Sequence, residues 1–208
     1  MPLQNRVLPT GEIVAIPARG MFTGNRGIIH DPATKTLLKR RWSTHAWLTC
    51  VLEFRARRRK VMERRSWTEL FFLDEATALA AGHRPCFYCR REDARRFRAA
   101  WEKGNRANEV HAPDIDAVLH RERFASSGKL HPLPMGIEKL PDGAMLQAGE
   151  ESFLIVAGKP LQWTPSGYRK VTASIRDAKL LTPPSIVRAF SAGYRPALHV
   201  SVEVPTAK

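Results

Sequence analysis

Residues 71 to 89 read FFLDEATALAAGHRPCFYC and carry the clearest local signals in the chain. The apolar run at their start belongs to a β-type segment, Trp67 to Leu73, and Asp74 is a good N-cap for a short helix over Glu75 to Ala81. Gly82 stands at the C′ position, where glycine commonly ends a helix. This stretch therefore predicts a strand, a short helix and a sharp stop.

Cys86 and Cys89 follow with two residues between them, and this spacing brings two thiolates to adjacent corners of a tetrahedron. We therefore predict a structural Zn²⁺ site. A redox pair would instead be expected after a strand of a βαβ unit, whereas a helix, Gly82 and Pro85 precede the cysteines here. Unliganded core cysteines are a further alternative.

The same stretch, about residues 70–90, resembles the second half of the zinc-binding module of Ada-type DNA-repair proteins, which is also appended to some nucleases. The pattern there is a strand, a short helix rich in Glu and Ala, and then Gly, an aromatic residue and Arg-Pro-Cys-x-x-Cys. The resemblance implies a zinc-binding protein that acts on nucleic acid. It does not extend to the rest of the chain.

In that family the other two zinc ligands lie upstream, in a segment of the type Gly-Ile-aromatic-Cys-x-Pro-x-x-Cys. The nearest counterpart here is GIIHDP, residues 27 to 32, which places His30 at the first ligand position and leaves the second without a ligand. The resemblance thus implies a site of His30, Cys50, Cys86 and Cys89, because Cys50 is the remaining one of three cysteines. His45 is the rival for the fourth position.

The family also implies a reaction, since a zinc-bound cysteine of the upstream segment takes a methyl group from DNA phosphotriesters. Histidine cannot accept a methyl group in this way, so the segment with His30 departs from the pattern. An alkyl transferase that uses Cys50 as the acceptor remains one alternative function.

The charge of the chain is the strongest bulk signal. A net charge of +14 and a pI near 10.4 favour polyanionic partners. Aromatic residues are interleaved with the basic ones, a mixture that suits phosphate neutralisation and base stacking. We predict binding to DNA or RNA, although the basic face of a protein-interaction module would look similar. The predicted contact residues are Arg55, Arg57, Arg58, Arg59, Lys60, Arg90, Arg91, Arg95 and Arg98.

Asp116 and His120 are candidates for a catalytic pair. They are four residues apart on a helix predicted from Pro113, so they face the same side, as in a general-base hydrolytic site. The plainer interpretation is a helix with acidic residues in its first turn and histidine near its end. A nucleic-acid hydrolase is thus a second alternative function.

The rest of the chain predicts an α+β fold in a single domain over 1–208, with a zinc-knuckle half at about 20–124 and a strand-rich half at about 144–204. The β-type runs Ala46 to Phe54 and Trp67 to Leu73 predict an antiparallel pair around an arginine-rich connection. Helices are expected from Arg91 to Glu102 and after Thr182, with Thr182 as N-cap and Pro183 at the first position.

The N-terminus has no apolar segment of signal-peptide length, and no run of about 18 apolar residues is present. We therefore expect a cytoplasmic protein that neither spans nor binds a membrane. The odd number of cysteines also favours a reducing compartment.

Overall fold

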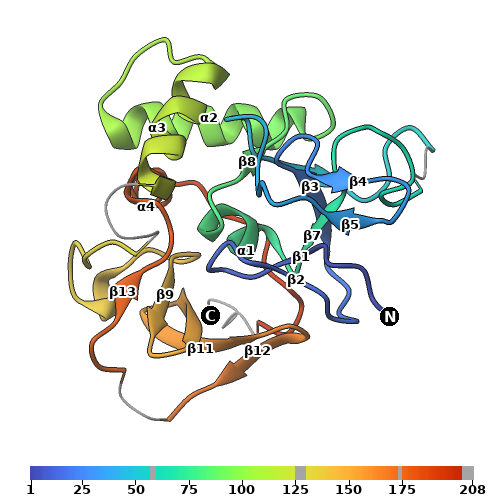
Figure 1. Cartoon of the computed structure of the whole chain (residues 1–208). Helices are drawn as coiled ribbons and strands as arrows, with labels where there is room; N and C mark the ends of the chain where they lie inside the picture. The colour runs from blue at the N-terminus through green and yellow to red at the C-terminus, as the bar shows by residue number, and fades with distance from the viewer. Residues whose placement is uncertain (57–59, 125–129, 173–174, 203–208) are drawn as a thin grey trace.

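The structure is a computed structural model that describes residues 1–56, 60–124, 130–172 and 175–202. It confirms the predicted α+β class, because the described residues form helices together with several sheets (Figure 1). The helices are α1 (Glu75–Ala80), α2 (Arg91–Asn105), α3 (Ala112–Phe124) and α4 (Pro184–Ser191), with a 3₁₀ turn at Ile137–Lys139.

A six-stranded mixed sheet has the order β2-β1-β7-β3-β6-β8. Its strands are β1 (Arg6–Val7), β2 (Ile13–Val14), β3 (Phe22–Asn25), β6 (Leu48–Val51), β7 (Leu70–Phe72) and β8 (Arg84–Pro85). A separate two-stranded ribbon joins β4 (His30–Asp31) and β5 (Thr36–Leu37).

The prediction that β6 and β7 pair with each other is wrong, because β3 lies between them. Thr23 of β3 stands opposite Cys50 on one side and Phe71 on the other, antiparallel to both. Gly24 permits this close approach, since a Cβ at that position would lie 2.0 Å from the carbonyl oxygen of Leu48.

The second half of the chain forms the predicted antiparallel sheet, with the order β12-β11-β10-β9-β13. Its strands are β9 (Met145–Ala148), β10 (Glu151–Val156), β11 (Lys159–Thr164), β12 (Gly167–Lys170) and β13 (Lys179–Leu180). All four pairings are antiparallel.

The predicted helix ends are partly confirmed. Asp74 caps α1 by accepting the amide of Thr77 at 2.9 Å, and Gly82 follows with φ +80°. The N-cap of α4 is Pro183 rather than Thr182, because the Thr182 hydroxyl instead accepts the Met145 amide at 2.8 Å. Helix α2 ends three residues later than predicted, at Asn105.

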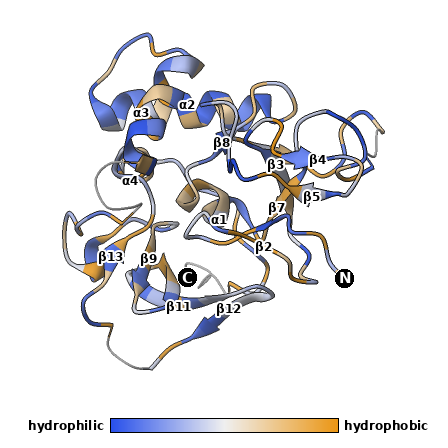
Figure 2. Cartoon of the chain, in the orientation of Figure 1, coloured by the Kyte–Doolittle hydropathy of each residue, from blue (hydrophilic) through white to orange (hydrophobic). Residues whose placement is uncertain are grey.

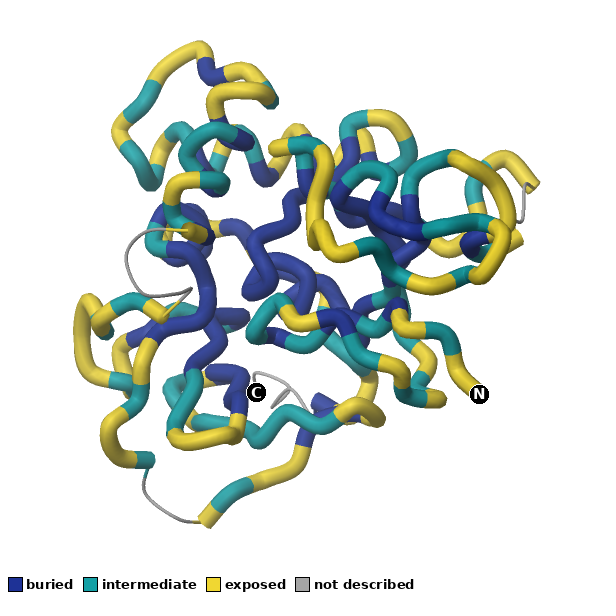
Figure 3. Tube along the Cα trace, viewed as in Figure 1, coloured by how far each residue is buried: buried dark blue, intermediate teal, exposed yellow. Residues whose placement is uncertain are grey.

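Helix α1 lies at the centre of the molecule, and all of its residues are buried (Figure 3). Its faces enter three apolar clusters: Leu79 packs with α2, α3 and α4, Ala76 and Ala80 pack with the antiparallel sheet, and Ala78 packs with the mixed sheet. Figure 2 shows α1 as apolar, in contrast to the more hydrophilic α2. The small alanine side chains let all these layers approach one short helix.

Two buried carboxylates at the N-terminus of α1 connect it to β12 and to the segment after α4. Asp74 accepts hydrogen bonds from the Tyr168 hydroxyl at 2.9 Å and the His199 amide at 3.1 Å. Glu75 accepts the Tyr194 hydroxyl at 2.7 Å. Burial raises the pKa of both carboxyl groups, so their hydrogen-bond partners are needed to offset desolvation.

We expect Asp74→Ala to lower the free energy of unfolding by about 3 kcal/mol, since it removes a helix cap and leaves buried donors without an acceptor. Urea denaturation followed by circular dichroism measures this change. The exposed Glu12 provides the control, and Glu12→Ala should stay within about 0.5 kcal/mol of wild type. Equal midpoints for the two variants would contradict this role of Asp74.

Candidate metal centre

Parallel pairing of β6 with β8 brings Cys50 and Cys86 together. Thr49 stands opposite Pro85 in this register, and the amide of Cys86 donates to the carbonyl of Thr49 at 3.0 Å. Cys50 is the next residue of β6, and Cys86 directly follows β8. A turn after β8 then returns Cys89 to the same place, with the Arg90 amide donating to the Cys86 carbonyl at 2.9 Å.

The sulfur atoms of Cys50, Cys86 and Cys89 all lie within 4.8 Å of one another. In a tetrahedral zinc site with Zn–S bonds of about 2.3 Å, neighbouring sulfurs are about 3.8 Å apart. The cluster therefore fits one metal ion with little rearrangement. Cys50 and Cys86 are 8% exposed, and none of the three cysteines forms a disulfide.

Hydrogen bonds within the cluster favour a thiolate at Cys86. The Tyr88 amide donates to the Cys86 sulfur at 3.4 Å, and the Val51 amide hydrogen-bonds to Cys89. The pKa of Cys86 is lowered because the side chains of Cys50 and Cys89 hydrogen-bond to it, whereas the pKa of Cys50 is raised by its hydrogen bonds with Cys86 and Cys89. For Cys89 the hydrogen bond with Cys50 lowers the pKa, but the hydrogen bond with Cys86 and burial outweigh it, so the pKa is raised. Helix α2 begins at Arg91, so its positive N-terminal end also faces the turn of Cys86 to Cys89, which we call the knuckle.

The structure does not bring His30 to these sulfurs. Both ring nitrogens of His30 have other partners: Nδ1 lies 2.7 Å from the Thr68 hydroxyl and Nε2 lies 3.1 Å from the carbonyl oxygen of Arg64. His45, the rival ligand, stacks on His120 with ring centroids 3.8 Å apart. Among the described residues, no further His, Cys, Asp or Glu joins the three-cysteine group.

A cavity of about 780 Å³ lies against the cluster, and all three cysteines line it. Its other walls are mainly apolar and aromatic, with a few polar side chains. The polar group buried most deeply is Glu69, which is 4% exposed and accepts the Met62 amide at 2.9 Å. The lining residues besides the cysteines are Thr23, Asn25, Leu48, Val51, Leu52, Phe54, Arg55, Val61, Trp67, Glu69, Phe71 and Tyr88.

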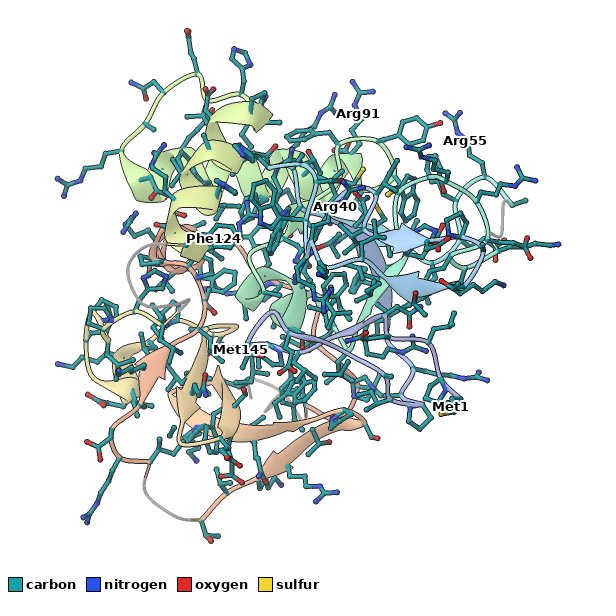
Figure 4. All side chains as sticks on the ribbon, viewed as in Figure 1. Met1, Arg40, Arg55, Arg91, Phe124 and Met145 are labelled. Carbon is teal, nitrogen blue, oxygen red and sulfur yellow. The ribbon has the colours of Figure 1, made fainter. Side chains whose placement is uncertain are left out.

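Only some of the residues predicted to contact nucleic acid are exposed. Arg55, Arg91 and Arg95 are exposed, and Figure 4 shows Arg55 and Arg91 at the same upper right region of the molecule. Arg98 is half-buried and Lys60 is exposed beside Glu63, at 3.3 Å. Arg57, Arg58 and Arg59 lie outside the described residues.

Arg90 is not available to a phosphate, which corrects its assignment to the contact surface. Its side chain is buried and pairs with Glu75 at 2.9 Å and with Asp93 at 2.8 Å. An arginine placed just after the knuckle thus connects the turn to helix α1. It belongs to the architecture that holds the cysteines in place.

The structure does not support Asp116 as the partner of His120. Both carboxylate oxygens of Asp116 are taken by the guanidinium of Arg84, at 2.8 and 2.7 Å, in a buried ion pair. His120 instead lies in an aromatic group with His45, Trp42 and Phe124. Its pKa is lowered by burial and then by His45 and Arg123.

One cavity residue and two buried arginines outside the cavity were not predicted from the sequence. Glu69 is charged but sits inside the apolar β-type run at Trp67 to Leu73, and that unusual position was the available signal for a cavity residue. Arg26 and Arg123 both stack on Trp47, with guanidinium carbons 3.9 and 4.0 Å from its ring centroid. Burial lowers the pKa of each arginine to about 9.

The chain matches no protein-family model, no curated protein and no solved structure. These comparisons show no similarity to the Ada-type module. Within the described part of the chain, no helix is long and apolar enough to cross a membrane.

We expect Asp116→Ala to cost about 3–5 kcal/mol of stability, because it leaves Arg84 buried without its counter-ion. Chemical denaturation measures the loss. Arg121→Ala is the control on the same helix, where an exposed side chain should contribute no more than about 0.5 kcal/mol. An Asp116→Ala protein as stable as this control would show that the ion pair does not hold β8 in place.

Proposed function

We propose that the protein binds one zinc ion through Cys50, Cys86 and Cys89 and binds nucleic acid through the basic surface beside that centre. The observation that carries the proposal is the group of three sulfurs within 4.8 Å. Thiolates are soft ligands that select zinc, copper(I) or iron–sulfur clusters, and a compact site on a knuckle with backbone amides around the sulfurs is typical of zinc.

The likeness to the Ada-type module supports the same assignment. Cys86 and Cys89 occupy its Cys-x-x-Cys, and Cys50 approaches from a neighbouring strand in place of an upstream cysteine. Three free thiols also suit the reducing cytoplasm that we propose as the location.

Nucleic-acid binding is supported by the charge and by what surrounds the knuckle. The ring of Tyr88 is 67% exposed, and the guanidinium of Arg55 lies 5.5 Å from its centroid. Arg91 begins the adjoining helix α2, whose five basic residues exceed its three acidic ones. Exposed aromatic and cationic groups together stack on bases and neutralise phosphates.

The ion pairs on α2 do not prevent this binding. Arg95 pairs with Glu92 at 3.0 Å on the helix surface, where both side chains are exposed. An exposed pair of this kind is worth at most about 1 kcal/mol, so a phosphate can compete for the arginine.

We predict binding to single- and double-stranded DNA and RNA with little sequence preference and a steep salt dependence. If about six phosphates are contacted, the affinity should fall roughly a thousandfold between 50 and 200 mM salt. Fluorescence anisotropy with labelled oligonucleotides measures the dissociation constants. A dissociation constant that does not change with salt would rule out arginine-driven binding.

Two double variants locate the surface. Arg91→Ala with Arg95→Ala should reduce the salt slope by about two, because two phosphate contacts are lost. Arg169→Ala with Arg176→Ala removes the same charge from exposed positions in the other half of the chain. If both double variants weaken nucleic-acid binding equally, only the net charge matters and the surface beside the knuckle is not the interface.

A further inference from the structure

We propose that the cavity beside the three cysteines binds a small planar nitrogen heterocycle, such as a nucleobase, whose ring nitrogen completes the coordination of the metal ion. This inference rests on the proposed zinc site and goes beyond it, because it assigns the site an exchangeable ligand rather than a purely structural role.

The number of protein ligands is the first reason. Zinc in proteins is usually four-coordinate, and a site with three protein ligands keeps its fourth position for water or a substrate. The described residues offer three sulfurs, while His30 is held by Thr68 and Arg64. Because Cys50, Cys86 and Cys89 all line the cavity, an ion bound to them is accessible from it.

The size and walls of the cavity are the second reason. A volume of about 780 Å³ falls in the range of small-molecule sites, which is roughly 300–1,000 Å³. Four aromatic side chains line it: Phe54, Trp67, Phe71 and Tyr88. Aromatic walls favour a flat ring, because stacking on one is worth about 1–3 kcal/mol per base.

The polar groups in the walls match the edge of an amino-substituted heterocycle. Glu69 uses its Oε2 to accept the Met62 amide, and within the described part of the chain its Oε1 has no hydrogen-bond donor, so Oε1 can accept from an amino group. Asn25 uses its Oδ1 to accept the Gly27 amide, and its Nδ2 has no acceptor among the residues that the structure describes, so it can donate to a ligand. A buried acceptor and a buried donor in a mainly apolar cavity fix the orientation of a ligand.

Arg55 is placed to bind a phosphate attached to such a ring. It lines the cavity, is exposed, and lies with its guanidinium over the rings of Phe54 and Tyr88, at 5.2 and 5.5 Å. A nucleotide with its base in the cavity would thus meet a cation at the surface. The same chemistry is offered by a free heterocycle and by an unpaired base of a bound strand.

The test uses the full chain loaded with Co²⁺, whose visible absorption bands report the ligands of a tetrahedral site. Metal content is measured first and should be one cobalt per chain. Titration with imidazole and with adenine should then shift the bands, with saturation at one ligand per metal. Failure to take up cobalt would contradict the proposed metal site itself. Full uptake with bands unchanged by either ligand would overturn the heterocycle proposal alone.

Two variants test the cavity rather than the metal. Val61→Trp fills space in the cavity wall and should abolish the adenine response at unchanged cobalt content, whereas Val200→Trp, at a fully exposed position, should leave it intact. Glu69→Gln should weaken adenine binding at least tenfold while the response to imidazole, which has no amino group, stays the same. An unchanged adenine affinity in both Val61→Trp and Glu69→Gln would contradict binding in this cavity.

Two single-stranded oligonucleotides distinguish a free heterocycle from an unpaired base as the ligand. One holds a single central adenine, and the other is the same strand with an abasic site at that position. A band shift with adenine in the strand and none with the abasic strand identifies an unpaired base as the ligand. A shift with free adenine alone identifies a free heterocycle. Band shifts of equal size with the adenine and abasic strands would contradict recognition of the base.

Discussion

The parallel register between β6 and β8 is the constraint on which the metal centre depends. It places Cys50 beside Cys86, residues that are far apart in the sequence, and the knuckle turn adds Cys89. Parallel neighbours require a crossover connection. The crossover from β6 to β8 includes β7 and the central helix α1. The position of β8 therefore depends on the packing of the whole mixed sheet.

Buried ion pairs fasten β8 and the knuckle to their neighbours. Arg84 precedes the knuckle and is held by Asp116 of α3, and Arg90 follows it and is held by Glu75 of α1. Such pairs contribute little net stability, because both partners lose their hydration, but breaking one of them is costly. They therefore act mainly by fixing a single arrangement of the strand and turn, and with it the geometry of the sulfurs.

Local signals in the sequence were sufficient for the knuckle and for the cap of α1. Cys86 and Cys89 are neighbours along the chain, and Asp74 satisfies an amide three residues away, so short-range chemistry fixes both. Pairings over long distances were not predictable in the same way. The position of β3 between β6 and β7 depends on Gly24, whose role is visible only once the strands meet.

The same distinction explains the misassigned site residues. His30 matched a family position by spacing, yet its hydrogen bonds with Thr68 and Arg64 depend on a segment more than thirty residues away. Arg90 was expected on the contact surface and Asp116 beside His120, because their actual partners, Glu75 and Arg84, approach only through tertiary packing. The cavity has no sequence motif at all, since its walls come from several separate segments.

The most direct test of a three-cysteine centre open to the cavity is X-ray absorption at the zinc edge of the loaded, ligand-free protein. We expect three sulfur neighbours at about 2.3 Å and one light neighbour at about 2.0 Å, without the scattering pattern of an imidazole. The spectrum should be the same in His30→Gln. A zinc coordination sphere with fewer than three sulfurs, or an imidazole signal that disappears in His30→Gln, would contradict this centre.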